Sequence, residues 1–455
     1  MTDKKRNQLI ELGAEVLADT LLELSSSDKI IKDVIKRLIS SPDEKVKLFK
    51  TKLSQIKRRT SFVDWNEGAA FAFELRELLS LLNDVKNPDV GLELVSLFLE
   101  ADQSIFERCD DSNGEIGGVY EYEAANLFVD FANRCTDKQK VIDYVIKLNQ
   151  DDGYGVRQFT FDRANEYLDE AMLRVMVDKL WEQLEAVDPN KEFAEYTKHH
   201  WCGGVKQIAK QLKDAPLFEQ AIAAYYACDD MELSTAGYIE IAEVYFESGE
   251  PQIALSWMDR IKKEGIHLLE ERNALLLKIY GELGNVESQA KIAWDIFKFN
   301  RTKETFDQLL SIIGSDDEDE ILANEINIIM REPDLSYVDA KFLLSEGYSD
   351  ELENYFLVRL DQIDGQYDYS TALFFISHFE VKGKFLISSL IHRILLNSIL
   401  ERANSKYYGY GVKYLKKLDQ LALSISDWKT FLSHQDYFQQ IKTKHERKRS
   451  FWSAY

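Results

Sequence analysis

The residues best suited to metal chemistry lie in an acidic glycine loop that follows Cys109. Asp111 and Asn113 have the spacing of two ligands in an EF-hand calcium loop whose sixth position is Gly114. The same register puts Cys109 first and Tyr120 twelfth, where the calcium loop needs carboxylates. The sequence therefore excludes the standard calcium loop.

Two interpretations of this loop remain. Asp111 and Asn113 could form a weaker divalent-cation site together with Asp151 and Asp152, which follow farther along the chain. Alternatively, the loop is a turn between helices, in which a glycine adopts a positive φ and the acidic side chains cap the next helix. The second interpretation is favoured, so we expect neither a metal ion nor another cofactor.

A second group of potential ligands is the run His199, His200, Trp201 and Cys202. Consecutive residues on a helix point about 100 degrees apart, so the two histidines rarely share one ion. A helix start or a surface role is favoured over a zinc site. The sequence contains no HExxH, GxSxG, Walker-type or GxGxxG motif, and it offers no support for nucleophilic or nucleotide-dependent catalysis.

The C-terminus combines positive charge with aromatic rings. The residues concerned are Lys444, His445, Arg447, Lys448, Arg449, Phe451 and Trp452. Such a mixture suits a phosphate backbone with unstacked bases, where each stacked base contributes roughly 1 to 3 kcal/mol. In the alternative interpretation, the two rings close the last hydrophobic groove as a cap while the charges stay solvated. The basic segment 45–59 allows a similar choice.

Charge is distributed unevenly along the chain. The 455 residues carry a net charge of −23, yet residues 1–59 contain 14 Lys and Arg against 9 Asp and Glu. Residues 401–455 contain 11 against 5. The acidic middle repels nucleic acid, whereas the two basic ends could contact a phosphate backbone, an acidic partner or the acidic body of the same molecule.

The elements that must position all these residues are helices. Hydrophobic residues make up 45% of the chain, only 6 prolines and 21 glycines are present, and apolar residues recur at three- and four-residue spacing. No apolar run reaches the roughly 18 residues of a membrane span, and the charged N-terminus lacks the core of a signal peptide. The four cysteines form no CxxC or CxC pair, so we expect reduced thiols and a cytoplasmic, all-α protein.

A helix hairpin recurs three times between residues 201 and 300. Its middle copy fills the packing positions of a tetratricopeptide repeat with Tyr238, Ile241, Ala242, Tyr245, Ala254, Met258 and Ile261. The equivalent small residues Ala221, Ala254 and Ala290 are 33 and 36 residues apart, against about 34 in the standard repeat. This period predicts an α-solenoid of stacked antiparallel helix hairpins, tetratricopeptide-like in the centre.

We expect three regions along the chain. Residues 1–190 form an N-terminal helical-repeat region, 191–300 the tetratricopeptide-like repeats, and 301–455 a C-terminal helical region with a basic tail. Most aromatic residues of the repeats fall at core positions. Trp257 is the exception because it precedes the core position of Met258, and an exposed tryptophan there would suit a partner peptide.

Several segments resemble a bacterial protein family known mainly as a domain of unknown function. They are 62–65, 106–117, 151–156, 403–415, 427–428 and 445–452. The C-terminal region of that family is also similar to that of bacterial SWIM zinc-finger proteins. The SWIM finger requires a CxC pair followed by CxH, which this sequence lacks. The resemblance therefore implies a helical-repeat protein without the zinc finger and without an assigned activity.

These observations lead to two hypotheses about function. The preferred one is a non-catalytic scaffold that binds a protein partner through the surface of the central repeats, because stacked hairpins create an extended binding surface. The acidic body predicts a partner with a basic face. The alternative is a nucleic-acid-associated factor that uses the basic N- and C-terminal segments. We expect no membrane partner, and the sequence defines no oligomeric state.

Overall fold

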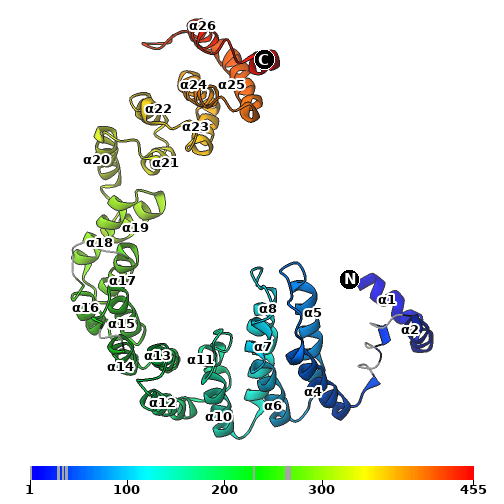
Figure 1. Ribbon diagram of the computed structural model, residues 1–455. Coiled ribbons are helices and arrows are strands. Elements are labelled where there is room, and N and C mark those ends of the chain that lie inside the picture. Colours follow the sequence, from blue (N-terminus) through cyan, green and yellow to red (C-terminus); the bar gives the residue numbers. More distant parts are fainter. Residues whose placement is uncertain (1–2, 28–30, 33–34, 36–38, 229–230, 262–267) are drawn as a thin grey trace. The chain divides into compact units, whose positions relative to one another are not determined.

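The computed structural model describes residues 3–27, 31–32, 35, 39–228, 231–261 and 268–455. Within these ranges the regular elements are helices, and the one strand-like pairing is an isolated parallel bridge between Val63 and Cys109. Neighbouring helices pack against each other in antiparallel hairpins along the chain (Figure 1). The predicted all-α fold of stacked hairpins is therefore confirmed. None of the described helices is long and apolar enough to cross a membrane.

The chain divides into two compact units, Met1–His267 and Leu268–Tyr455. The helices of the first unit are α1 (Asp3–Glu11), α2 (Ala14–Ser27), α4 (Pro42–Arg58), α5 (Gly68–Leu79), η1 (Ser80–Leu82), α6 (Pro88–Leu99), α7 (Asp102–Phe106), α8 (Glu115–Gly118), η2 (Val119–Ala124), α9 (Ala125–Arg134), α10 (Lys138–Asn149), α11 (Phe159–Asp162), η3 (Ala164–Glu166), α12 (Glu170–Glu185), α13 (Ala194–Leu212), α14 (Ala215–Ala227), α15 (Thr235–Glu247) and α16 (Pro251–Met258).

The second unit is also helical in its described residues. Its helices are α17 (Leu269–Glu282), α18 (Val286–Phe299), α19 (Lys303–Ile313), α20 (Glu318–Arg331), α21 (Tyr337–Ser345), α22 (Ser349–Leu357), η4 (Leu360–Gln362), α23 (Tyr369–Val381), α24 (Phe385–Arg402), η5 (Ser405–Tyr407), α25 (Tyr408–Ala422), α26 (His434–Lys444) and α27 (Arg449–Ala454).

Short polar side chains start many of these helices by accepting a hydrogen bond from an N–H group of the first turn. Ser41 forms a complete capping box with Glu44 at the start of α4, and Pro42 occupies the first helical position. Further N-cap side chains that accept such a bond are Asn87, Asp137, Asp169, Asp214, Ser234, Asn285, Thr302, Ser336 and Ser433. Local sequence thus determines where each of these helices begins.

The three central hairpins form as the sequence predicts. In the first unit α13 packs on α14 and α15 on α16, and in the second unit α17 packs on α18. Ala221 and Ala254 are fully buried, whereas Ala290 is half-buried. The boundary between the units lies inside segment 191–300. The division of the chain into three functional regions stays a prediction.

Close helix contacts shape the core of the first unit. This core is a continuous cluster of apolar side chains that runs from Phe49 on α4 to Ala221 on α14. Where α6 meets α9, a Cβ atom added to Gly91 would lie 2.2 Å from a ring carbon of the buried Phe131. Glycine is therefore required at this position, because any side chain would displace a ring that has no free space around it.

Buried ion pairs add polar contacts within each unit. In the first unit Arg157 pairs with Asp102, and both side chains are buried. In the second unit Arg301 lies 3.2 Å from the carboxylate of Glu325 on α20 and 3.3 Å from that of Asp339 on α21. Loss of one partner of such a pair leaves an uncompensated buried charge, so these contacts restrict which helices can pack together.

Replacement of Gly91 tests the close packing of α6 on α9. Gly91→Ala should lower the free energy of unfolding by about 1–3 kcal/mol, because the new methyl group overlaps the ring of Phe131. Gly203→Ala is the matched control, since Gly203 also lies within a helix and no atom lies within 4 Å of its added Cβ. The control should raise stability by about 0.5–1 kcal/mol through helix propensity. Urea unfolding followed by circular dichroism measures both, and equal effects of the two changes would contradict the packing.

Candidate partner-binding surfaces

The acidic glycine loop is a helix-capping turn. Gly114 has a φ of 70°, in the left-handed region. The two carboxylate oxygens of Asp111 accept hydrogen bonds from the backbone N–H groups of Ile116 and Gly117, each at 2.8 Å. Both oxygens are therefore engaged at the start of α8, as the capping interpretation of the sequence predicts.

The other potential ligands of this metal site have separate partners. The Asn113 amide donates to the carbonyl oxygen of Trp65 at 3.1 Å. Asp152 is buried and accepts from the backbone N–H of Arg157 at 3.1 Å, and burial raises the pKa of its carboxyl. Asp151 is exposed. Across the described residues, no three His, Cys, Asp or Glu side chains come together as a metal site, so these candidates do not converge.

The run that begins at His199 lies in the body of α13, not at its start, so the expected helix-start role is wrong. Trp201 and Cys202 are buried in the core. The His199 ring stacks on the ring of Tyr225 at 4.3 Å between centroids. Burial lowers the pKa of His200. Burial is also the main cause, and the neighbouring Cys228 thiol the next, of the raised pKa of Cys202, which is about 12. These side chains serve packing, since a neutral buried thiol is a poor metal ligand.

Trp257 is not the exposed anchor that the sequence predicts. Its side chain is 8% exposed. The ring of Tyr238 on α15 lies 6.0 Å from its ring, and the guanidinium of Arg260 lies 3.7 Å from its centroid. The repeat pattern shows which residues lie inside a hairpin, but it does not show what covers the hairpin from outside. Here Tyr238 and Arg260 cover the Trp257 indole, so the indole is unavailable to a partner peptide.

The C-terminal rings form a cap on the second unit. Phe451 is fully buried within a cluster contributed by α24, α25 and α26. The Trp452 indole donates to the carbonyl oxygen of His445 at 2.8 Å, and His445 is itself buried. Lys444 pairs with Glu401 at 2.7 Å. The packing agrees with the cap interpretation, and Phe451 has no face available for stacking on a base.

The remaining charges of the C-terminal cluster stay accessible. Arg447 and Arg449 are exposed and Lys448 is half-buried. None of the three forms an ion pair within the described part of the chain, and Arg447 and Arg449 are open to solvent. Contact between them and a phosphate backbone stays a prediction.

Two hollows flank α18 in the second unit, and no sequence motif marks them. The first, of about 320 Å³, lies between α17, the end of α18 and α19 and includes Phe299, which is 63% exposed. The second, of about 670 Å³, lies between α18 and α20 and includes the half-buried Trp294. The ammonium of Lys298 lies 5.2 Å from the Trp294 ring centroid. We call these two hollows with their aromatic residues the α18 surface.

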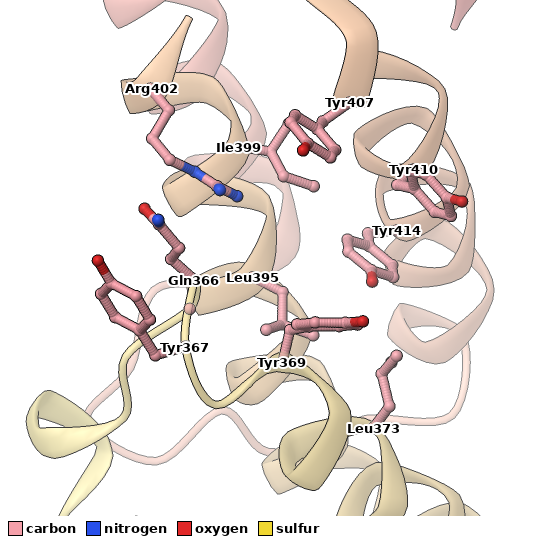
Figure 2. Close-up of a pocket in the computed structure, with 11 residues that line it drawn as sticks. Gln366, Tyr367, Tyr369, Leu373, Leu395, Ile399, Arg402, Tyr407, Tyr410 and Tyr414 are labelled. Atoms are coloured by element: carbon pink, nitrogen blue, oxygen red, sulfur yellow. The ribbon is translucent and has the colours of Figure 1, made fainter. Parts of the chain in front are cut away.

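A third hollow, also in the second unit, is lined by five tyrosines (Figure 2). Its volume is about 460 Å³. The residues that line this tyrosine pocket are Gly365, Gln366, Tyr367, Tyr369, Leu373, Leu395, Ile399, Arg402, Tyr407, Tyr410 and Tyr414. Residues three, four or seven apart share one helix face, which explains how α23, α24 and the η5–α25 segment each contribute one wall.

One sequence signal could have indicated this pocket. Tyr407, Tyr410 and Tyr414 have the spacing of a single helix face, and that face is not fully buried. The helix itself is predictable from the sequence. Its pairing with Tyr369 of α23 and Arg402 of α24 is a tertiary contact, which no local pattern contains.

The helices α1 and α2 carry exposed apolar side chains. The most exposed are Leu9, Ile10, Leu12, Val16, Leu22 and Leu24. No residue of α2 is buried. An apolar stripe of this kind is typical of a surface that contacts another macromolecule.

A known protein family matches the chain over nearly its whole length. The model of a family of unknown function, DUF6880, matches residues 3–454. No curated protein matches the chain. A solved structure described as a circular tandem repeat protein with novel repeat topology and enhanced subunit contact surfaces is similar at 15% identity over 98% of each chain. The TM-score of that pair is 0.17, too low to bear on the fold.

The capping role of Asp111 leads to a stability prediction. Asp111→Ala should lower the free energy of unfolding by about 0.5–2 kcal/mol, because two N–H groups at the start of α8 lose their acceptors. Asp151→Ala, at an exposed carboxylate, should change it by less than about 0.5 kcal/mol. Thermal unfolding with and without Ca²⁺, Mg²⁺, Mn²⁺ or Zn²⁺ measures both. An ion that raises the melting temperature of the unaltered chain but not that of Asp111→Ala would contradict the capping role.

Proposed function

The chain belongs to the DUF6880 family of unknown function, and we propose that it is a non-catalytic scaffold that binds a protein partner through the surface of its central repeats. The observation that carries this proposal is the α18 surface, which belongs to the third repeat hairpin. Two aromatic side chains remain accessible there, each beside a hollow. We place the protein in the cytoplasm, as its cysteine usage suggests.

Aromatic residues next to hollows are suited to partner binding because a few large side chains supply most of the binding energy at interfaces. Phe299 is 63% exposed at the end of α18, and the half-buried Trp294 lies five residues earlier, on the side of the second hollow. Phe297 of the same helix is fully buried, and its ring lies 6.1 Å from that of Trp294 between centroids. The helix thus divides its aromatic residues between the core and the accessible surface, which supports a binding role for the accessible ones.

The charges beside Trp294 are of both signs. Glu287 and Asp295 are exposed at the rim of the larger hollow, and Lys291 and Lys298 belong to the same lining. An apolar side chain of the partner would enter the hollow, and charged residues of either sign could flank it. The expectation of a basic partner therefore rests on the net charge of −23 of the whole chain.

The apolar stripe on α1 and α2 gives independent support to an interaction protein. Exposed apolar side chains gathered on neighbouring helices are typical of a surface that contacts another macromolecule. The stripe does not identify its own partner, and the proposal does not depend on it.

The alternative function is contact with nucleic acid through the basic ends. It is motivated by the charges of segments 1–59 and 401–455 and by the resemblance of the C-terminal region to that of SWIM proteins. Arg447, Lys448 and Arg449 would contact phosphates. Phe451 is buried and Trp452 packs in the C-terminal cap, so neither ring supports the alternative by stacking on a nucleic-acid base.

The partner proposal predicts a specific loss on mutation of the α18 surface. The double variant Trp294→Ala, Phe299→Ala should recover at least about tenfold less partner than the unaltered chain, because both aromatic anchors are gone. The measurement is affinity purification from the native source at low and high salt, with mass spectrometry of the recovered proteins. Phe73→Ala is the matched control, since Phe73 is 61% exposed on α5 in the first unit.

Two results would contradict the proposal. One is recovery of the same proteins in equal amounts by the double variant and by the control. The other is failure of the unaltered, fully expressed chain to recover any protein above background at low salt.

The nucleic-acid alternative has its own test. If it holds, the chain shifts single- or double-stranded DNA or RNA at low salt, and the triple change Arg447→Ala, Lys448→Ala, Arg449→Ala lowers the salt slope of binding by roughly 0.7–0.9 for each phosphate that is no longer neutralised. Electrophoretic shifts over a salt series measure this. The absence of any shift at low salt would eliminate the alternative.

A further inference from the structure

We propose that the tyrosine pocket of the second unit binds an extended, proline-rich peptide segment, whose backbone carbonyls accept hydrogen bonds from Arg402 and Gln366. This site is separate from the α18 surface, since no residue lines both. It is an additional binding site of the chain, and whether it binds a peptide is independent of what the α18 surface binds.

The walls of the pocket place aromatic rings on one side and nitrogen donors on the other. Figure 2 shows Tyr407, Tyr410 and Tyr414 on one side, Arg402 and the loop with Gln366 and Tyr367 facing them, and Tyr369 between the two sides. Leu395 and Ile399 of α24 add apolar side chains to the lining. The volume of about 460 Å³ falls within the usual range for binding pockets.

The tyrosine hydroxyls of the pocket have no hydrogen-bond partner in the described protein. Other tyrosines of the same unit do: Tyr337 donates to Asp368 at 2.8 Å, Tyr437 to Asn397 at 2.8 Å and Tyr455 to Asp419 at 2.6 Å. Burial raises the pKa of Tyr414. The pocket therefore presents hydroxyl groups without a protein partner, together with ring faces, to a ligand.

The nitrogen groups of the pocket make it rich in donors. The Arg402 Nε donates to the carbonyl oxygen of Ser398 at 3.2 Å, which leaves the terminal N–H groups of the guanidinium available. The Gln366 side chain has no partner within the described chain and adds two further N–H groups against one carbonyl oxygen. A complementary ligand must bring more acceptors than donors.

Proline-rich segments have this property. A proline has a carbonyl oxygen but no N–H group, so a run of prolines offers acceptors alone. The polyproline II conformation directs these carbonyls outward and is already extended before binding, which reduces the entropy cost. Its rings pack well against aromatic side chains, a mode of recognition that recurs in unrelated domains.

The charge of the pocket favours this uncharged ligand over two others. Arg402 is the only basic residue of the lining, and the nearby Asp364 carboxylate offsets its charge. A nucleic-acid strand needs several cations along its backbone, which the lining does not supply. A quaternary ammonium ligand, which tyrosine rings can bind, would be repelled by the positive charge of the Arg402 guanidinium in the same pocket.

The loop that carries Gln366 and Tyr367 is fixed in place. One oxygen of Asp364 accepts from the backbone N–H groups of Gln366 at 2.7 Å and Tyr367 at 3.0 Å, and these bonds lower the pKa of the Asp364 carboxyl. A Cβ atom on Gly365 would lie 2.8 Å from the carbonyl oxygen of Ile394 on α24. Gly365 is thus a positioning residue that lets the loop approach the helix.

The experiment uses the full chain and a fluorescein-labelled decaproline peptide, with fluorescence anisotropy as the readout. We expect saturable binding with a Kd below about 1 mM. Tyr410→Ala should weaken it at least about tenfold, because the wall loses one of its rings. Arg402→Leu should weaken it as well, since the carbonyls lose their charged donor. Gly365→Ala should weaken binding as well, because the added methyl group pushes the loop with Gln366 and Tyr367 away from α24 although no lining side chain is removed.

Controls separate this site from the rest of the molecule. Tyr196→Ala is matched to Tyr410→Ala, since the two side chains are 58% and 56% exposed, and it should leave binding unchanged. Trp294→Ala should also leave it unchanged, so that failure of the α18 surface and failure of this site are distinguishable. A glycine-serine peptide of equal length should not bind.

Three outcomes would overturn the proposal. The first is no saturable decaproline binding up to about 1 mM. The second is binding that Tyr410→Ala and Arg402→Leu leave unchanged. The third is tighter binding of a labelled oligo(dT) strand that competes with the peptide and depends on the same tyrosines, which would assign the pocket to nucleic acid.

Discussion

A helix hairpin cannot bury its apolar face alone, and this constraint determines how the protein is built. Within each unit a hairpin completes its core by stacking on its neighbour in the chain, as α13–α14 does with α15 in the first unit. Close approach then requires small residues at defined points, such as Ala221, Ala254 and Gly91. Surfaces that the stacking does not use stay accessible, and the candidate binding sites lie on them.

Most of the polar side chains that could bind a metal ion or take part in a reaction instead stabilise the fold. Asp111 uses both carboxylate oxygens to start a helix, and Asp152 lies in a buried network with Arg157 and Asp102. Buried charges of this kind must be paired, because desolvation makes an unpaired one costly. Two of the accessible features that remain are aromatic: the α18 surface and the tyrosine pocket.

The sequence predicted what depends on local pattern. Helix periodicity, N-caps and the spacing of small residues are local, so the all-α fold, the three hairpins and the capping turn at Asp111 could be foreseen. Trp257 was mispredicted because its exposure depends on Tyr238 and Arg260, which the repeat pattern does not place. The tyrosine pocket was missed because its residues come from α23, α24, the η5–α25 segment and the loop 365–367, whose mutual packing no period in the sequence specifies.

Contact between the accessible aromatic residues of α18 and a protein partner can be tested by site-specific photo-crosslinking, with p-benzoylphenylalanine in place of Phe299 or, as the control, of Phe73 on α5. We expect a discrete protein adduct from position 299 in the native cell, lost when Trp294→Ala is added, and no such adduct from position 73. Identical adducts from both positions, or an adduct at 299 that Trp294→Ala leaves unchanged, would contradict it.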